Sequence, residues 1–462
     1  MEYSEFVASK LAAVPPCGFS PPRGLRVPLA EFQSDLVRWS LRRGRAAIFA
    51  DTGLGKTRMQ LAWASAVAKK AGKGARVLIL APLAVAKQTA SEGEAVGVAV
   101  TVCRDGSDVR PGVNVTNYDR LHRFDPGEFC AVVLDESSCI KHHDTKTLAA
   151  LLESFRATPY RLCCTATPAP NDWTELGTHA EFLGVCSRTE MLSEFFCHDG
   201  GETQVWRLKG HARSAFWRWV SSWGAMVKSP ADLGHDASAY ALPELRLHEH
   251  LVRSDWRPAD GALFAEHAET LTERRDARKQ SVVDRVRECA AAVAAEPGES
   301  WVIWCDLNAE GDALRAAIPE AVEIRGSDDL DAKEQRLDEF AAGGVRVLVT
   351  KPSIAGFGLN WQHCARMAFV GVTDSWESYY QAVRRCWRFG QKRPVEVHIF
   401  AAESEGAVVA NLRRKEADAA ALAAALAAET REAVRAEVRG AVRSTNDYDP
   451  QTTMEVPAWL AA

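Results

Sequence analysis

The stretch Ala50–Thr57, with the sequence "ADTGLGKT", holds the residue types of a phosphate-binding loop. It follows an apolar run and precedes a helical pattern, which is the context that such a loop needs. Gly53 and Gly55 let the backbone curl so that successive N–H groups point inward, and the following helix adds the positive end of its dipole. Lys56 can reach the β- and γ-phosphates, and the Thr57 hydroxyl can bind Mg²⁺. The predicted triphosphate site comprises Asp51, Thr52, Gly53, Leu54, Gly55, Lys56 and Thr57.

A second stretch, "AVVLDESS", brings two carboxylates to the end of an apolar run. Triphosphate hydrolysis needs one carboxylate on the Mg²⁺ side and another to handle the attacking water. Asp135 and Glu136 follow the run directly, which puts both at the carboxyl edge of a parallel sheet. An acidic pair after a strand is also common as a charge pair at a helix N-terminus. The phosphate-binding loop upstream favours the chemical interpretation, with Asp135 as a Mg²⁺ ligand and Glu136 as the base.

The elements that must position these residues are short apolar runs that alternate with helical stretches. From about residue 30 to 180 the expected strands are "RAAIFA", "RVLILAP", "VNVTNYDRL", "CAVVLDE" and "RLCCTATP". Between about 256 and 405 the same alternation returns in "SWVIWCDLN", "AVEIRGS", "VRVLVTKP", "ARMAFVGV" and "VEVHIFAA". Strand, loop and helix in repetition predict two doubly wound α/β domains with parallel sheets, arranged in tandem.

Changes in composition set the expected domain boundaries. An aromatic and basic segment with few strand signals separates the two domains, and we expect it to be a helical insert. The tail is Ala-rich with charges at helical spacing and then turns polar, which predicts a helix followed by a disordered end. The predicted organisation is a lead-in at 1–27, a first domain at 28–184, an insert and linker at 185–255, a second domain at 256–405 and a tail at 406–462.

The insert contains a stretch at 206–228 that mixes basic residues with tryptophans. One interpretation is a nucleic-acid contact in which aromatic rings stack on bases. The other is an amphipathic helix, because four apolar residues recur at helical spacing. We favour core packing for these four, which are Phe216, Trp219, Val220 and Trp223. The basic residues stay candidates for backbone contacts, and they are Arg207, Lys209, Arg213 and Arg218.

Composition limits the other classes of function. The net charge is −5, so no basic field extends over the whole chain, although a basic cleft can exist within an acidic exterior. The 12 cysteines include no C-x-x-C pair, which argues against a zinc site, and adjacent His142 and His143 point in different directions on any regular element. No apolar stretch reaches the ~18 residues of a membrane span, and the N-terminus lacks a signal-peptide pattern. We expect a cytoplasmic protein with reduced thiols and no membrane contact.

Taken in order, these motifs resemble the first motor domain of superfamily-two helicases, and most closely that of the Swi/Snf-like DNA translocases. The resemblance rests on "FADTGLGKT", "VLDESSCIKHHDTKT" and "LCCTATPAPNDWTEL". It implies RecA-like domains and an adenine contact by Gln33, which lies in "LAEFQSDLVRW". The compact chain also resembles helicases encoded by bacteriophages and prophages, which implies the cytoplasm of a bacterial host.

The second domain agrees with this resemblance. "VLVTKPSIAGFGLNWQHC" and "ESYYQAVRRCWRFGQKRP" resemble the fifth and sixth motifs of the family, the sixth having the pattern Q-x-x-x-R-x-x-R-x-G-Q. The match implies that Arg385 and Arg388 are arginine fingers, which stabilise charge on the transferring γ-phosphoryl group. It further implies that Gln381 acts beside them and that Gly358 contacts the nucleotide.

The expected lysine and carboxylates lie in the first domain and the arginines in the second, so a complete site requires the cleft to close around Mg-ATP. The resemblance implies a nucleic-acid-stimulated ATP hydrolase, either a DNA helicase or a duplex DNA translocase, with ATP and Mg²⁺ as cofactors. DNA is favoured over RNA because the sixth motif and the stretch at 140–146, which begins with Ile140 and Lys141, resemble the Swi/Snf branch. An RNA-dependent helicase stays an alternative, as does a nucleotide-binding scaffold that recruits replication or defence partners without turnover. The expected contacts to the nucleic-acid backbone are Pro82, Lys87, Thr116, Asn117, Arg325, Ser327 and Lys351.

Overall fold

The computed structural model describes most of the two domains. The described residues are 16–82, 85–141, 145–170, 172–199, 202–253, 279–355, 360–371, 375–402, 414, 431–432, 434–436 and 438. Gly358, both adjacent histidines at 142 and 143, and most of the tail therefore lie outside the described residues.

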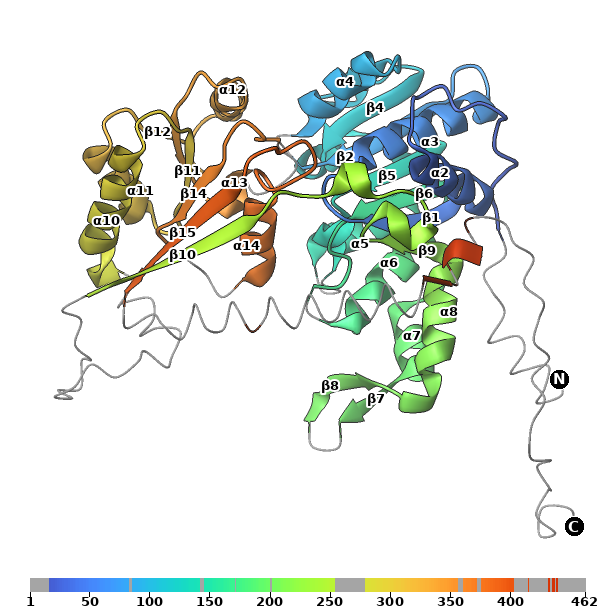
Figure 1. The fold of residues 1–462 in the computed structure, drawn as a ribbon. Helices are drawn as coiled ribbons and strands as arrows, with labels where there is room; N and C mark the ends of the chain where they lie inside the picture. The colour runs from blue at the N-terminus through green and yellow to red at the C-terminus, as the bar shows by residue number, and fades with distance from the viewer. Residues whose placement is uncertain are drawn as a thin grey trace, which may run out of the picture.

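The first domain is built on a seven-stranded sheet with the order β3-β4-β2-β5-β6-β1-β9, in which all paired strands run parallel. Its strands are β1 (Arg45–Ala50), β2 (Arg76–Ala81), β3 (Val100–Val102), β4 (Gly112–Asn117), β5 (Ala131–Asp135), β6 (Tyr160–Thr165) and β9 (Gly224–Val227). The helices that cover it include α2 (Glu31–Arg43), α3 (Lys56–Ala71), α4 (Ala86–Ala95), α5 (Lys146–Phe155) and α6 (Leu176–Leu183) (Figure 1).

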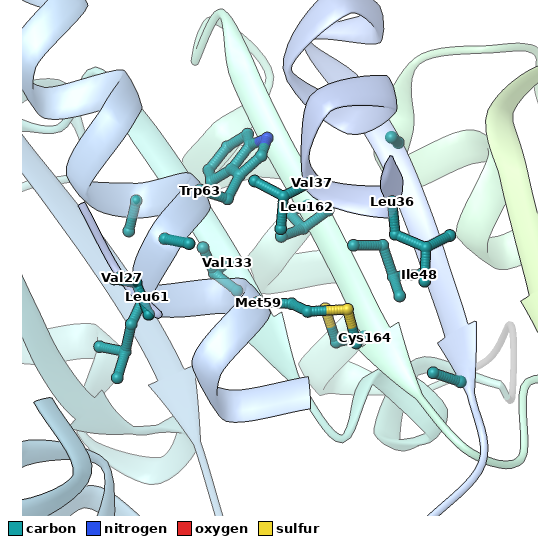
Figure 2. Close-up of a cluster of buried hydrophobic side chains, with 14 of the residues drawn as sticks. Val27, Leu36, Val37, Ile48, Met59, Leu61, Trp63, Val133, Leu162 and Cys164 are labelled. Atoms are coloured by element: carbon teal, nitrogen blue, oxygen red, sulfur yellow. The ribbon is translucent and has the colours of Figure 1, made fainter. Parts of the chain in front are cut away.

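Successive residues of strand β1 face two separate cores. Ala46 and Ile48 pack on the side of α2 and α3, where Met59 and Trp63 cover the sheet (Figure 2). Phe49 packs on the opposite side, with α5 and α6. Burial on both faces is why the strands are continuous apolar runs rather than alternating ones.

The second domain has a six-stranded parallel sheet with the order β10-β15-β14-β11-β13-β12. Its strands are β10 (Leu245–Val252), β11 (Trp301–Trp304), β12 (Val322–Glu323), β13 (Val347–Thr350), β14 (Arg366–Phe369) and β15 (Val395–Ala402). Its helices are α10 (Val282–Ala295), α11 (Asn308–Ala317), α12 (Leu330–Ala341), α13 (Pro352–Ala355) and α14 (Trp376–Val383). The prediction of two parallel α/β domains in tandem is confirmed.

The segment 185–255 differs from the expected helical insert, because it contributes strands to both domains. After α7 (Arg188–Phe195), the antiparallel hairpin of β7 (Phe196–Asp199) and β8 (Glu202–Leu208) projects from the first domain (Figure 1). Helix α8 (Arg213–Trp223) follows and leads into β9, which pairs with β1. Strand β10 then pairs with β15. The physical reason is that β9 and β10 each extend an open sheet edge, where a strand needs a partner on one side alone.

The tryptophan-rich stretch packs as the amphipathic-helix interpretation predicted. Phe216, Val220 and Trp223 are buried on α8, and Trp219 packs against the same core. Lys209 donates hydrogen bonds to the backbone carbonyls that end helix α7, at Ser193 and Glu194. None of the helices in the described ranges is long and apolar enough to cross a membrane.

Candidate nucleotide site between the two domains

The phosphate-binding loop lies between β1 and α3, as its sequence context predicts. Gly53 has φ +91° and Gly55 has φ +80°, a left-handed conformation that side chains other than glycine rarely adopt. A Cβ atom on Gly53 would also lie 2.9 Å from the backbone nitrogen of Phe389, which belongs to the second domain. The loop is therefore both curled and in close contact with the opposite domain.

A cavity of about 460 Å³ opens in front of this loop, and both domains line it. The first domain contributes the loop, the acidic pair and the N-terminal region of α2. The second domain contributes the turn that follows α14. The sequence-predicted residues that line the cavity are Gln33, Thr52, Gly53, Gly55, Lys56, Thr57, Pro82, Asp135, Glu136, Arg385 and Arg388.

Lys56 begins helix α3 and turns back over the loop. Its ammonium group donates hydrogen bonds to the backbone oxygens of Ala50 (2.9 Å) and Asp51 (3.3 Å). Burial lowers the pKa of Lys56, while the nearby carboxylates, Glu136 foremost, oppose this shift. A buried ammonium with these neighbours is stabilised by a further anion at the loop.

Asp135 ends strand β5 and is held by a residue that sequence reasoning missed. Gln60, one turn after Lys56 on α3, donates to Asp135 Oδ1 at 2.7 Å. Tyr118 donates its hydroxyl to the backbone oxygen of Asp135 at 2.7 Å. Burial raises the pKa of Asp135 to about 6, against the effect of the Gln60 hydrogen bond and of the Lys56 charge. The i, i+4 spacing from Lys56 was the signal that could have indicated Gln60.

Glu136 has an unusual backbone for a residue with a side chain. Its φ of 53° and ψ of 55° are left-handed, and among the described residues no other non-glycine residue has a positive φ. Its Oε1 accepts hydrogen bonds from the hydroxyls of Thr165 (2.6 Å) and Ser138 (3.0 Å). Strained backbone of this kind persists where surrounding contacts over-determine it, often at functional sites. The carboxylate at the cavity is thus held in one orientation.

Arg385 and Arg388 lie in the turn that follows α14, and both face the cavity. Burial lowers the pKa of Arg385 to about 10 and that of Arg388 to about 9, and the neighbouring arginines lower the latter further. The backbone oxygen of Gln381, one turn earlier, accepts a hydrogen bond from Arg385 Nε at 2.9 Å. Its own amide donates to Glu377 at 3.4 Å. Several buried cations so close together favour a polyanion between them.

Gln33 is buried on α2 beside the loop, with its amide oriented by backbone groups. Its Nε2 donates to the oxygen of Leu54 at 2.8 Å, and its Oε1 accepts from the nitrogen of Ala30 at 3.0 Å. Tyr240 and Phe389 line the same end of the cavity and stack with ring centroids 4.8 Å apart. This end has the amide and the aromatic faces that suit a nucleobase.

Two further predicted loop residues lie away from the 460 Å³ cavity. Asp51 and Leu54 line a smaller cavity of about 60 Å³, which shares Thr52 and Gly53 with the larger one. There the Asp51 carboxylate contacts Tyr380 and Arg384 of the second domain.

The residues at the cavity fit a magnesium-bound triphosphate. The loop glycines and the Lys56 ammonium suit phosphate oxygens, and the hydroxyl of Thr57 with the carboxylate of Asp135 suits Mg²⁺, which prefers oxygen ligands. Asn360 also lines the cavity, and its buried Oδ1 has no hydrogen-bond partner among the described residues. The chemistry of the donors and this polar atom are both consistent with an ATP-sized ligand.

The first-domain residues that are predicted to contact a nucleic-acid backbone lie in different environments. Pro82 and Asn117 line a second cavity of about 310 Å³, which Glu136 also borders. Lys87 pairs with Glu334 of the second domain at 2.5 Å. Thr116 is buried, and its hydroxyl donates to the oxygen of Cys103 at 2.9 Å. The Thr116 hydroxyl is therefore engaged inside the domain.

In the second domain these candidates follow strands β12 and β13. Arg325 is paired with Glu323 at 2.7 Å and with Asp312, and these carboxylates raise its pKa. Ser327 is exposed in the same loop, and Lys351 directly follows β13. The structure thus brings the predicted ATP residues into one cavity but distributes these contacts over several loops.

Comparisons with known proteins fall on the same two domains. The family model of the SNF2-related domain matches residues 32–220. The model of the helicase conserved C-terminal domain matches residues 285–390. Together the two models cover more than half of the chain, the first matching the first domain and the second matching the second domain. No curated protein matches the chain significantly.

Proposed function

Because the chain belongs to the superfamily-two helicases of the Snf2-like type, we propose that it is a DNA-stimulated ATPase that couples Mg-ATP hydrolysis to movement on DNA. One observation carries this proposal: Lys56, Glu136 and Arg388, from both domains, line a single cavity of ATP size.

Each side chain in the cavity has a distinct task in this proposal. Lys56 binds the β- and γ-phosphates, and the loop amides hold the phosphate oxygens. Glu136, oriented by Thr165 and Ser138, positions the attacking water and accepts its proton. Arg385 and Arg388 stabilise the charge that develops on the γ-phosphoryl oxygens. Thr57 and Asp135 would hold Mg²⁺, which supplies charge neutralisation on the β- and γ-phosphate oxygens when bound.

Movement follows from the division of these tasks between the domains. The triphosphate stabilises the closed arrangement of the domains because it contacts groups from both of them. Loss of the γ-phosphate removes part of that stabilisation. If each domain also binds a nucleic-acid backbone, opening and closing become steps along it. Backbone amides, hydroxyls and lysines suit phosphates and carry no sequence code, so we propose binding that is independent of sequence.

DNA is the polymer that we propose, because the resemblance is to the DNA-translocating branch of the superfamily. The test is the ATPase rate with no polymer, with single-stranded DNA, with duplex DNA, with forked DNA and with RNA. We expect stimulation by DNA, and Glu136→Gln serves as the inactive control. Stimulation by RNA alone would indicate an RNA-dependent helicase, and no turnover with any polymer would indicate a nucleotide-binding scaffold.

A further inference from the structure

The Asp51 carboxylate, in the phosphate-binding loop, binds the second domain. Its Oδ1 accepts hydrogen bonds from the Tyr380 hydroxyl at 2.7 Å and from the backbone nitrogen of Thr52 at 2.6 Å. Its Oδ2 pairs with Arg384 Nη2 at 2.9 Å. Both partners from the second domain lie on α14 or directly after it. The loop that cradles phosphate is therefore also a contact surface between domains.

Arg384 contacts this loop through a backbone hydrogen bond as well as through its ion pair with Asp51. The same Nη2 donates to the backbone oxygen of Thr52 at 2.9 Å. The side chain is only 4% exposed, and its guanidinium lies over the rings of Tyr380 (5.6 Å) and Trp387 (5.1 Å). A cation that is buried, paired and stacked in this way favours one geometry of its partner.

Arg384 directly precedes the first of the two arginines that face the cavity. Arg385 and Arg388 line the ATP-sized cavity, while Arg384 lines the smaller cavity. The backbone of Phe389 also approaches Gly53 too closely for a Cβ atom. One turn of chain thus contacts the loop through Arg384 and Phe389 and presents Arg385 and Arg388 to the ATP-sized cavity.

We propose that Arg384 and Tyr380, acting on Asp51, are positioning residues for ATP hydrolysis. They clamp the second domain to the phosphate-binding loop and so set the place of Arg385 and Arg388 relative to the phosphates. The inference rests on the proposed ATPase function and adds to it a contact outside the pattern of the sixth motif, in which position 384 is unspecified.

The clamp also explains why the Asp51 carboxylate contacts the second domain, although the motif predicted Asp51 beside the nucleotide. Lys56 donates to the backbone oxygen of Asp51, while Arg384 binds its carboxylate. The loop conformation and the contact between domains are therefore coupled through one residue.

Steady-state ATPase assays with DNA test the clamp on Arg384→Gln, Arg384→Lys and Tyr380→Phe. We expect Arg384→Gln to lower kcat by about 30-fold or more, the range for truncating one partner of a buried, hydrogen-bonded charge pair. Affinity for a fluorescent ATP analogue should change little, because Arg384 is not among the residues that line the 460 Å³ cavity. Arg384→Lys keeps the charge and should recover part of kcat. Tyr380→Phe loses one hydrogen bond and should show a smaller loss.

Arg393→Gln is the matched control. Arg393 follows the same motif but pairs with Glu299 inside the second domain, at 2.8 Å, and we expect its kcat to equal that of the wild type. Thermal unfolding of every variant identifies a general loss of fold, in which case Tyr380→Phe carries the test.

A second readout separates the clamp from the proposed function. Hydrogen exchange of the backbone amides at 51–57 needs no turnover, and we expect faster exchange in Arg384→Gln than in the wild type or Arg393→Gln. A wild-type protein without ATPase activity overturns the proposed function, while exchange still tests the clamp. Unchanged exchange in Arg384→Gln, or an unchanged kcat where the wild type is active, overturns the clamp.

Discussion

The first domain distributes its functional side chains over several strand ends, whereas the second domain gathers its own in one turn. Lys56 follows β1, Glu136 follows β5 and Thr165 ends β6, so a parallel sheet fixes the distances between them. Arg385 and Arg388 lie within one turn after α14, and contacts across the cleft set their place. The comparison teaches that the first domain is organised internally, whereas the second, in the proposed function, contributes to catalysis only in contact with the first.

The largest effect is expected in the first domain. Lys56→Ala removes the ammonium that, in the proposed function, binds the phosphates in both the ground state and the transition state. We expect no turnover above background and a loss of nucleotide affinity, measured by ATPase assay and by titration with a fluorescent ATP analogue. Full turnover in this variant would remove the phosphate-binding loop from the mechanism.

The second-largest loss of ATPase activity is expected from a change in the second domain. Arg388→Ala should lower kcat by about 10³-fold, within the range known for arginine fingers, because the cation acts on charge that develops during transfer. Nucleotide affinity should stay close to that of the wild type. A large loss of affinity with a small change in kcat would indicate that Arg388 binds the ground state, contrary to the division of tasks.

A smaller effect is expected where the two domains meet beside the base. Glu377 of α14 accepts from the Thr167 hydroxyl at 3.3 Å and pairs with Lys141 of the first domain. The backbone nitrogen of Thr167 donates to Thr165, which in turn donates to Glu136. We expect Glu377→Gln to lower kcat by about 10-fold, the scale of one buried charge-assisted hydrogen bond. An unchanged kcat would exclude this chain of contacts from the orientation of Glu136.

The smallest effect concerns the stability of the first domain alone. His179 is buried behind the acidic pair and contacts the Ser137 hydroxyl at 3.1 Å. Burial lowers its pKa from 6.5 to about 4, so the unfolded chain binds more protons between these pH values. The contribution of His179 to the free energy of unfolding should therefore fall by about 1–2 kcal/mol between pH 7 and pH 5, and comparison with a His179 variant separates it from that of Asp135, whose raised pKa acts in the opposite direction. Urea unfolding at both pH values measures this loss, and His179→Phe should reduce it; an equal loss in that variant would contradict the assignment to His179.

The sequence alone predicted both parallel sheets, apart from strands β3, β9 and β10, and it predicted the motif residues that line the cavity, whereas Asp51 and Leu54 line a different one. Strands buried on both faces have continuous apolar runs, and motifs that follow such runs lie at one edge of the sheet. These local signals placed Lys56 and Glu136 correctly after strands, whereas Arg388 lies in the turn after α14; the cavity brings the three together.

The contacts that the sequence did not predict depend on pairs of residues far apart in the chain. Arg384 and Asp51 are separated by 333 positions, and nothing in the spacing of either motif links them. Strand β10 was missed because an edge strand buries little surface, as the exposed Leu247 and Leu251 show. Thr116 was expected at a nucleic-acid contact, and only the fold reveals that its hydroxyl is directed to Cys103.

The distance between the two domains during the ATP cycle tests most directly whether catalysis requires them to meet. Fluorescent labels on non-natural amino acids at Lys73 and Gly298, both exposed and on opposite domains, would report this distance by energy transfer. We expect the Glu136→Gln variant to bind ATP without hydrolysing it, so in this background Mg-ATP should give one closed distance and ADP a longer one. The same distance with Mg-ATP, with ADP and without nucleotide would contradict a site that is assembled by closure.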